Sequence, residues 1–253
     1  MALRVAPVEL SDFDSFVSDA SKYAPGDDLV APPNPVAWPV STRPEAEQRA
    51  RRCFALQRRR FLEDPTVRFL KVVDDSPEGG GGGGGAVVAV ARWHYYEGGY
   101  KYEREAHWEM APLNTAEGED GEVGEGESYP PPNFNVRLHN HILTERDSFR
   151  EQWIPSRKPC WILMHLVTRP SQRRKGAAGL LIRWGMERSR ESGVPAYLEA
   201  GVQGKPVYER FGFVVVGEER RVSLEGLGEV YMGLKEFVMA NMKWDPSIAG
   251  PGQ

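Results

Sequence analysis

The stretch from residue 160 to residue 213 decides the fold, and it reads CWILMHLVTRPSQRRKGAAGLLIRWGMERSRESGVPAYLEAGVQGKPVYERFGF. The apolar run Cys160–Thr168 predicts a buried strand, and a basic, glycine-containing turn at 173–179 opens an amphipathic helix. About twenty residues after the turn, residues 195–200 predict a second strand, as a crossover between parallel strands requires. The stretch therefore predicts a strand, helix and strand unit.

The turn that opens the predicted helix has the chemistry of a phosphate site. The first N–H groups of a helix lack partners inside it, and its dipole adds positive potential. Small residues at Gly176, Ala178 and Gly179 would let an anion approach the backbone. The basic run 173–175 could instead be a nuclear-localisation or nucleic-acid patch, or a solvated helix start, but neither explains the glycine spacing. The Walker and dinucleotide-binding glycine patterns do not fit.

The spacing Arg173-x-x-Gly176-x-Ala178 resembles the coenzyme A signature of the GCN5-related N-acetyltransferase (GNAT) superfamily. Residues 207–213, Val-Tyr-Glu-Arg-Phe-Gly-Phe, are similar to the family's helix-to-strand junction. Within the superfamily, these motifs resemble most those of small fungal acetyltransferases. The resemblance is close over residues 160–220 and elsewhere extends only to the order of elements.

The resemblance implies the fold of acyl-CoA N-acyltransferases, an α/β (α+β) class with a mixed, mostly antiparallel sheet flanked by helices. We expect one domain over residues 1–240 and a tail at 241–253. In the family the sheet splays beside the fourth and fifth strands. A glycine run at 79–85 predicts a flexible hairpin loop. An insertion at about 98–158 contains an acidic, glycine-rich stretch at 117–127 that we expect to be disordered.

Other elements follow from local patterns. Thr42 and Glu45 form a capping-box pattern that opens a helix to about Glu63. The remaining expected elements are a strand at 3–8, a helix after Ser11, an irregular segment at 24–39, a hairpin from 66–73 and 86–96, a helix near 135–153, and strands at 213–222 and 229–237.

The resemblance implies acetyl-CoA as cosubstrate and assigns roles to particular residues. The backbone of residues 166–168 would pair with pantetheine, and an N–H near Val167 would polarise the thioester carbonyl. Tyr208 would be the general acid that protonates the departing thiolate. The implied cofactor-binding residues are Leu166, Val167, Thr168, Arg173, Arg174, Lys175, Gly176, Ala177, Ala178 and Gly179.

The general base is less defined by the sequence. Glu109 is the candidate we select, and Glu199 is the alternative, although its motif favours a structural role. Strict alternation would put Leu166 on the same face as Ile162 and Met164, and His165 on the opposite face as a packed histidine. His139 and His141 are interpreted as surface or acceptor-site residues. Water, or an amine that arrives partly neutral, could replace a base altogether.

These observations predict transfer of an acetyl group from acetyl-CoA to a primary amine by direct attack in a ternary complex. Gly201 stands where relatives often carry Asn or Ser, which motivates an alternative, a CoA-binding sensor or scaffold without catalysis. A different acyl group, or an oxygen acceptor, is a further alternative. The sequence leaves the acceptor open.

Composition sets the remaining limits. The 253 residues carry a net charge of −4 and no apolar run of membrane-spanning length. The two cysteines, Cys53 and Cys160, fit neither a metal site nor a disulfide framework and suggest a reducing compartment. We expect no metal, a location in the cytoplasm or nucleus, and a small-molecule or peptide amine as partner rather than nucleic acid or membrane. The oligomeric state stays open.

Overall fold

A computed structural model describes residues 3–76, 85–102, 131, 133–228 and 233–248. The elements are β1 (Leu3–Pro7), α1 (Asp12–Ala20), α2 (Asn34–Ala37), α3 (Arg43–Glu63), β2 (Val67–Asp74), β3 (Ala86–Tyr96), α5 (Val136–Arg150), β4 (Cys160–Thr168), η2 (Pro170–Gln172), α6 (Ala177–Ser192), β5 (Ala196–Gly201), α7 (Lys205–Glu209), β6 (Val214–Val215), β7 (Arg220–Ser223) and β8 (Glu236–Trp244).

The strands form one sheet in the order β1-β2-β3-β4-β5-β8-β6, and β7 also pairs with β8. Only β4 and β5 run parallel, while every other pair described is antiparallel. The single parallel pair is the one connected through helix α6, as a crossover requires. The structure thus confirms the predicted mixed, mostly antiparallel sheet flanked by helices.

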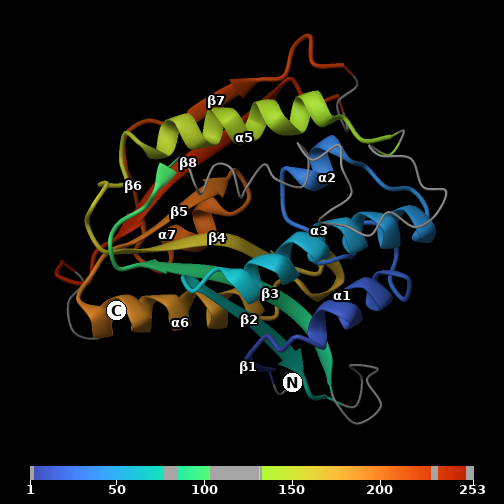
Figure 1. Cartoon of the computed structure of the whole chain (residues 1–253), viewed down its shortest axis with the longest axis horizontal. Helices are drawn as coiled ribbons and strands as arrows, with labels where there is room; N and C mark the ends of the chain where they lie inside the picture. The colour runs from blue at the N-terminus through green and yellow to red at the C-terminus, as the bar shows by residue number, and fades with distance from the viewer. Residues whose placement is uncertain (1–2, 77–84, 103–130, 132, 229–232, 249–253) are drawn as a thin grey trace.

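Helices cover both faces of the sheet (Figure 1). On one face, α6 buries Leu181 and Ile182 against the central strands. On the other face, α1 and α3 pack Phe16 and Phe54 onto β2 and β3, and α5 packs Ile142 beside β7 and β8. Both faces of the central strands are therefore buried, which explains why β3 and β4 read as continuous apolar runs.

Local signals in the sequence predicted several elements correctly. The Thr42 side chain accepts the Glu45 N–H, and the Glu45 carboxylate accepts the Thr42 N–H at 3.0 Å, so the capping box forms. The hairpin of β2 and β3, the strand Cys160–Thr168 and the helix α5 also lie where they were expected. The segment at 24–39 is irregular except for the short helix α2.

The C-terminal strands differ from the prediction. The stretch expected as one strand at 213–222 is two short strands, β6 and β7, and the final strand was placed too early, since β8 runs from Glu236 to Trp244. It therefore includes the first four residues of the segment expected to be a tail. β8 is central, with β5 on one side and β6 and β7 on the other. Buried Ala240 and Asn241 are weak strand formers, which obscured it.

Three expectations fall on residues that the structure does not describe: the glycine run at 79–84, the acidic stretch at 117–127 and the proposed base Glu109. Among the helices that are described, none is long and apolar enough to cross a membrane. The described residues also contain no cluster of three or more His, Cys, Asp or Glu side chains that could hold a metal ion.

Helix α6 packs unusually close to the sheet at Gly185. A Cβ atom at Gly185 would lie 2.1 Å from the ring of Trp93, which is fully buried and donates its indole N–H to the Leu181 carbonyl. We expect Gly185→Ala to lower the free energy of unfolding by at least about 1–3 kcal/mol through overpacking. Chemical denaturation measures this. Gly201→Ala is the matched control, since a Cβ there meets no atom within 4 Å. Equal stability of the two variants would contradict this packing.

Candidate active site

The site begins where β4 and β5 part. Only three residue pairs join the two strands: Trp161 with Ala196, Ile162 with Tyr197 and Leu163 with Leu198. Beyond Leu163, β4 continues to Thr168 alongside β3, whereas β5 continues alongside β8. This is the splay that the resemblance implied. A cleft of about 820 Å³ lies beside the separated part of β4.

The cleft collects nearly all of the predicted cofactor residues. Those that line it are Leu166, Val167, Thr168, Arg173, Arg174, Gly176, Ala177, Ala178 and Gly179. Lys175 is not among the lining residues, and its ammonium group donates to Gln172 Oε1 at 2.7 Å. One cleft thus joins the end of β4 to the start of α6.

The turn before α6 has the backbone geometry of an anion site. Arg174 and Gly176 both have left-handed φ angles, 65° and 93°, and α6 starts directly after them. Glycine suits position 176 because residues with a side chain rarely adopt such a φ angle. Gly179 has a different reason to be small: a Cβ there would lie 3.0 Å from the Phe211 ring. Gly179 and Phe211 both line the cleft, so this close packing forms part of the cleft lining.

The segment between α1 and α2, together with Pro35 of α2, forms another wall of the cleft, through Gly26, Asp28, Val30, Pro32 and Pro35. Hydrogen bonds join this wall to the residues just before the turn. The Asp27 carboxylate accepts the Ser171 N–H at 2.8 Å and its hydroxyl at 2.7 Å, and Arg169 donates to the Asp27 carbonyl at 2.9 Å. These contacts join residues far apart in the chain, so no local pattern could have predicted them.

Tyr208, the predicted general acid, lies on α7 in the core beside the cleft. Its side chain packs edge-on against Phe213 with ring centroids 6.0 Å apart, and burial raises its pKa above the usual value. Gly204 and Val207 of the same segment line the cleft, but Tyr208 is not among the lining residues. The phenol is therefore protonated at neutral pH and sits immediately behind the cleft wall.

Glu199, the alternative base, is held in a buried ion pair. Arg150 donates to both of its carboxylate oxygens, with Nη2–Oε2 at 3.0 Å, and also donates to the Tyr100 hydroxyl at 2.8 Å. Burial would lower the pKa of Arg150, but Glu199, Tyr100 and Asp147 together outweigh this and raise it. Glu199 therefore connects β5 to α5, the structural role that its motif favoured.

A β-bulge in β4 corrects the predicted alternation. Arg92 of β3 pairs with His165 and Trp93 pairs with Leu163, so Met164 is the extra residue. Leu166 consequently packs on the α6 side, whereas Ile162 and Met164 belong to a cluster on the opposite face. The expectation that these three residues share a face was wrong.

Because of the same bulge, the consecutive residues Met164 and His165 line the same pocket. His165 is buried, as expected of a packed histidine; it lies edge-on to Phe69, with Nε2 3.2 Å from the Leu29 carbonyl. His165 and Met164 both line a second, smaller pocket of about 70 Å³.

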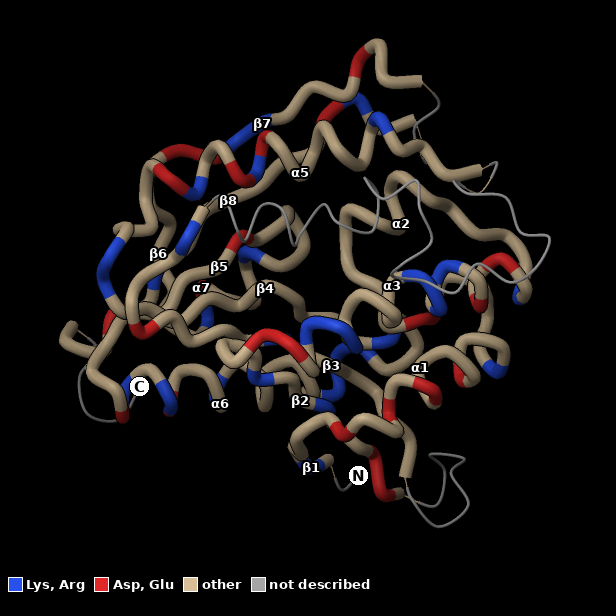
Figure 2. The backbone as a smooth tube through the Cα atoms, viewed as in Figure 1, with Lys and Arg blue, Asp and Glu red and all other residues tan. Residues whose placement is uncertain are grey.

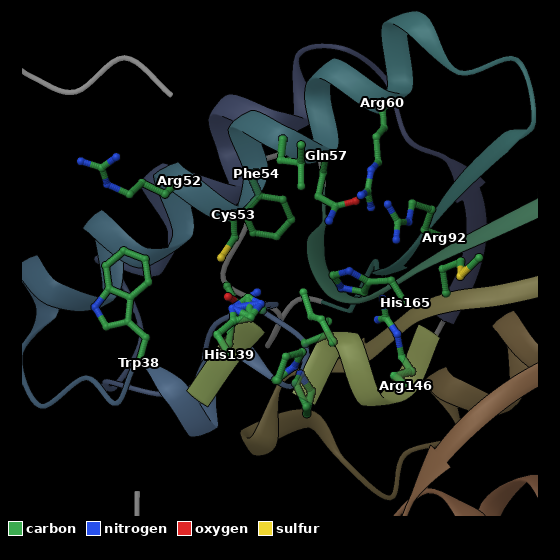
Figure 3. Close-up of a pocket in the computed structure, with 18 of the residues that line it drawn as sticks. Trp38, Arg52, Cys53, Phe54, Gln57, Arg60, Arg92, His139, Arg146 and His165 are labelled. Atoms are coloured by element: carbon green, nitrogen blue, oxygen red, sulfur yellow. The ribbon is translucent and has the colours of Figure 1, made fainter. Parts of the chain in front are cut away.

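The second pocket lies between α3, α5 and the bulge of β4 (Figure 3). Its lining side chains include Trp38, Arg52, Cys53, Gln57, Arg60, Arg92, His139, Arg146 and His165. His139 is buried there, whereas Nε2 of His141 lies outside it, 3.2 Å from the Ser223 carbonyl. Burial raises the pKa of Cys53 to about 12, so its thiol is neutral. The sequence was interpreted as placing His139 and His141 on the surface or in an acceptor site, and it gave no signal for the arginines.

Comparison with known proteins agrees with this geometry. Residues 136–213, from α5 to the end of the Tyr-Glu-Arg-Phe-Gly-Phe motif, match the model of the acetyltransferase (GNAT) family. The fold is similar to that of arylalkylamine N-acetyltransferase 2 from Aedes aegypti, with 14% identity and a TM-score of 0.53 over 97% of this chain and 100% of that one. An agmatine N-acetyltransferase is 15% identical, with a TM-score of 0.50 over 96% and 99%. Among curated proteins, no match is found.

The match to the GNAT acetyltransferase family covers the residues that contain β4, the turn at the start of α6, β5 and α7. The likeness to these solved N-acetyltransferases shows the fold of this chain.

Proposed function

We propose that this protein transfers the acetyl group of acetyl-CoA to a primary amine by direct attack within a ternary complex. The observation that carries the proposal is the continuous cleft from the separated part of β4 to the turn before α6. One cleft can therefore hold a diphosphate at the helix start and a thioester arm beside a strand whose main chain has lost its β5 neighbour.

The protein's own groups would bind and orient the cosubstrate. The first amides of α6, with the exposed cations Arg173 and Arg174, would hold the pyrophosphate. The main chain of residues 166–168 would pair with the pantetheine arm, since β5 has turned away from this part of β4. A backbone N–H near Val167 would stabilise negative charge on the carbonyl oxygen as the amine attacks.

The proton balance fits direct attack. The amine nitrogen bonds to the acetyl carbon, the carbon–sulfur bond breaks, and the thiolate takes a proton from Tyr208. A base, proposed to be Glu109, removes the proton of the amine. A covalent relay through cysteine is disfavoured, because burial raises the pKa of Cys53 and of Cys160 to about 12 and neither lines the cleft. The acceptor would be a small-molecule or peptide amine, and the unpaired thiols suit the cytoplasm or nucleus.

The first test is calorimetric titration with acetyl-CoA, for which we expect micromolar binding or tighter. The second is an unbiased amine screen that follows release of the CoA thiol. Absence of acetyl-CoA binding would overturn the proposal. Binding without transfer to any amine would favour the sensor or scaffold, and preference for a longer acyl-CoA or an alcohol would change the reaction assigned.

A further inference from the structure

The arginine-lined pocket adjoins the cleft. Val30 and Pro32 line both spaces. Along β4, Met164 and His165 line the pocket and the next residues, starting with Leu166, line the cleft. The shared lining residues Val30 and Pro32 put the pocket and the cleft side by side, so one small molecule could extend from one into the other.

Three guanidinium groups from three elements meet at the pocket. Figure 3 shows Arg60 of α3, Arg92 of β3 and Arg146 of α5 pointing toward one another near His165, whereas Arg52 points away. Arg60 and Arg92 are each only 2% exposed. Arginine positions recur along α3 (Figure 2). The described residues that line the pocket include no Asp or Glu.

These arginines also make contacts within the protein, so a ligand would join an existing network. Arg146, for example, donates to the neighbouring Asp147 at 3.0 Å. Arginine keeps its charge in proteins. An anion between the guanidinium groups would be attracted by all three charges, and the guanidinium fork matches the oxygens of carboxylate or phosphate.

The size of the pocket sets the scale of the ligand group. About 70 Å³ accommodates a few non-hydrogen atoms, comparable to one carboxylate or phosphate group. A polyamine would bring further cations to a cationic pocket. The geometry points to an acceptor that is a primary amine bearing an oxyanion, carboxylate or phosphate, which the pocket binds while the amine reaches the cleft. This inference rests on the proposed function, and it assigns the substrate class.

The test uses pairs of amines that differ only in the anionic group. β-Alanine is compared with its amide, and phosphoethanolamine with ethanolamine; spermidine represents the polycations. Binding to the CoA-loaded protein is measured by calorimetry, with malonate and inorganic phosphate as simple anion probes. Turnover is measured in parallel. Acetyl-CoA binding is titrated separately, so that failure of the proposed function is seen on its own.

The expected result is that at least one anionic amine binds about ten- to a hundredfold more tightly than its neutral partner, the range for hydrogen bonds to charged groups. Comparing the two pairs tells whether carboxylate or phosphate is preferred. Arg146→Gln should remove most of the preference, and Arg146→Lys should restore part of it. Arg137→Gln, an exposed position on the same helix, should leave it unchanged. Thermal unfolding checks that each variant is folded.

Several results would overturn the inference. Neutral amines or spermidine could bind as well as the anionic amines, or neither malonate nor phosphate could bind to the wild-type protein. A preference that Arg146→Gln leaves intact would place the anion elsewhere. The amine preference and the anion binding are both measured on the wild-type protein. They therefore test the inference even if Arg146→Gln does not fold.

Discussion

Replacement of Tyr208 by Phe is expected to lower kcat about ten- to a thousandfold, the usual contribution of a general acid. The phenol is buried and protonated, so it can give its proton to a thiolate leaving from the adjoining cleft. Phenylalanine keeps the ring and its edge-on contact with Phe213, so the free energy of unfolding and the affinity for acetyl-CoA should hardly change.

Single-turnover kinetics with a saturating acceptor measures the chemical step directly. Tyr197→Phe is the matched control, because Tyr197 is also a buried tyrosine, burial raises its pKa to about 12, and it lines neither the cleft nor the arginine pocket. Should Tyr208→Phe turn over as fast as the wild type, the tyrosine is a packing residue and water or another group is the acid.

The double replacement of Arg173 and Arg174 by Glu should raise the KM for acetyl-CoA about a hundredfold, while kcat changes only a few-fold. Both side chains are exposed at the start of α6, where carboxylates would face the pyrophosphate. The pyrophosphate does not change during the reaction, so its contacts contribute to binding equally in the ground state and the transition state.

Initial rates over a range of acetyl-CoA concentrations separate the two constants. The control replaces Arg51 and Arg58, exposed on α3, by Glu, which alters the net charge equally at a distance from the turn. An unchanged KM in the Arg173 and Arg174 variant would show that the turn does not bind the cosubstrate.

The sequence predicted best what is encoded in contiguous residues. One continuous stretch contains the strand Cys160–Thr168, the glycine turn, α6 and β5. Its periodicity and small residues predict each of these elements. The capping box at Thr42 is likewise local. Nearly all of the predicted cofactor residues line the cleft, because they all belong to this stretch.

The features that could not be predicted from the sequence depend on contacts between residues far apart in the chain. The bulge at Met164 is a mismatch between β3 and β4, and it puts Leu166 on the face opposite to Met164 instead of on the same face. The central place of β8 depends on its three partner strands. The arginine pocket combines residues from α3, β3 and α5, each of which looks like an ordinary surface arginine in the sequence.

The parting of β4 from β5 has a consequence for the sheet itself, because it creates an edge in the interior. Edge strands carry unpaired main-chain groups that can recruit strands of other molecules and lead to aggregation. Here the residues of β4 beyond Leu163 form such an edge. The segment around Pro32 and the start of α7 enclose it. The protein thereby keeps a main-chain binding surface while shielding it from the chains of its neighbours.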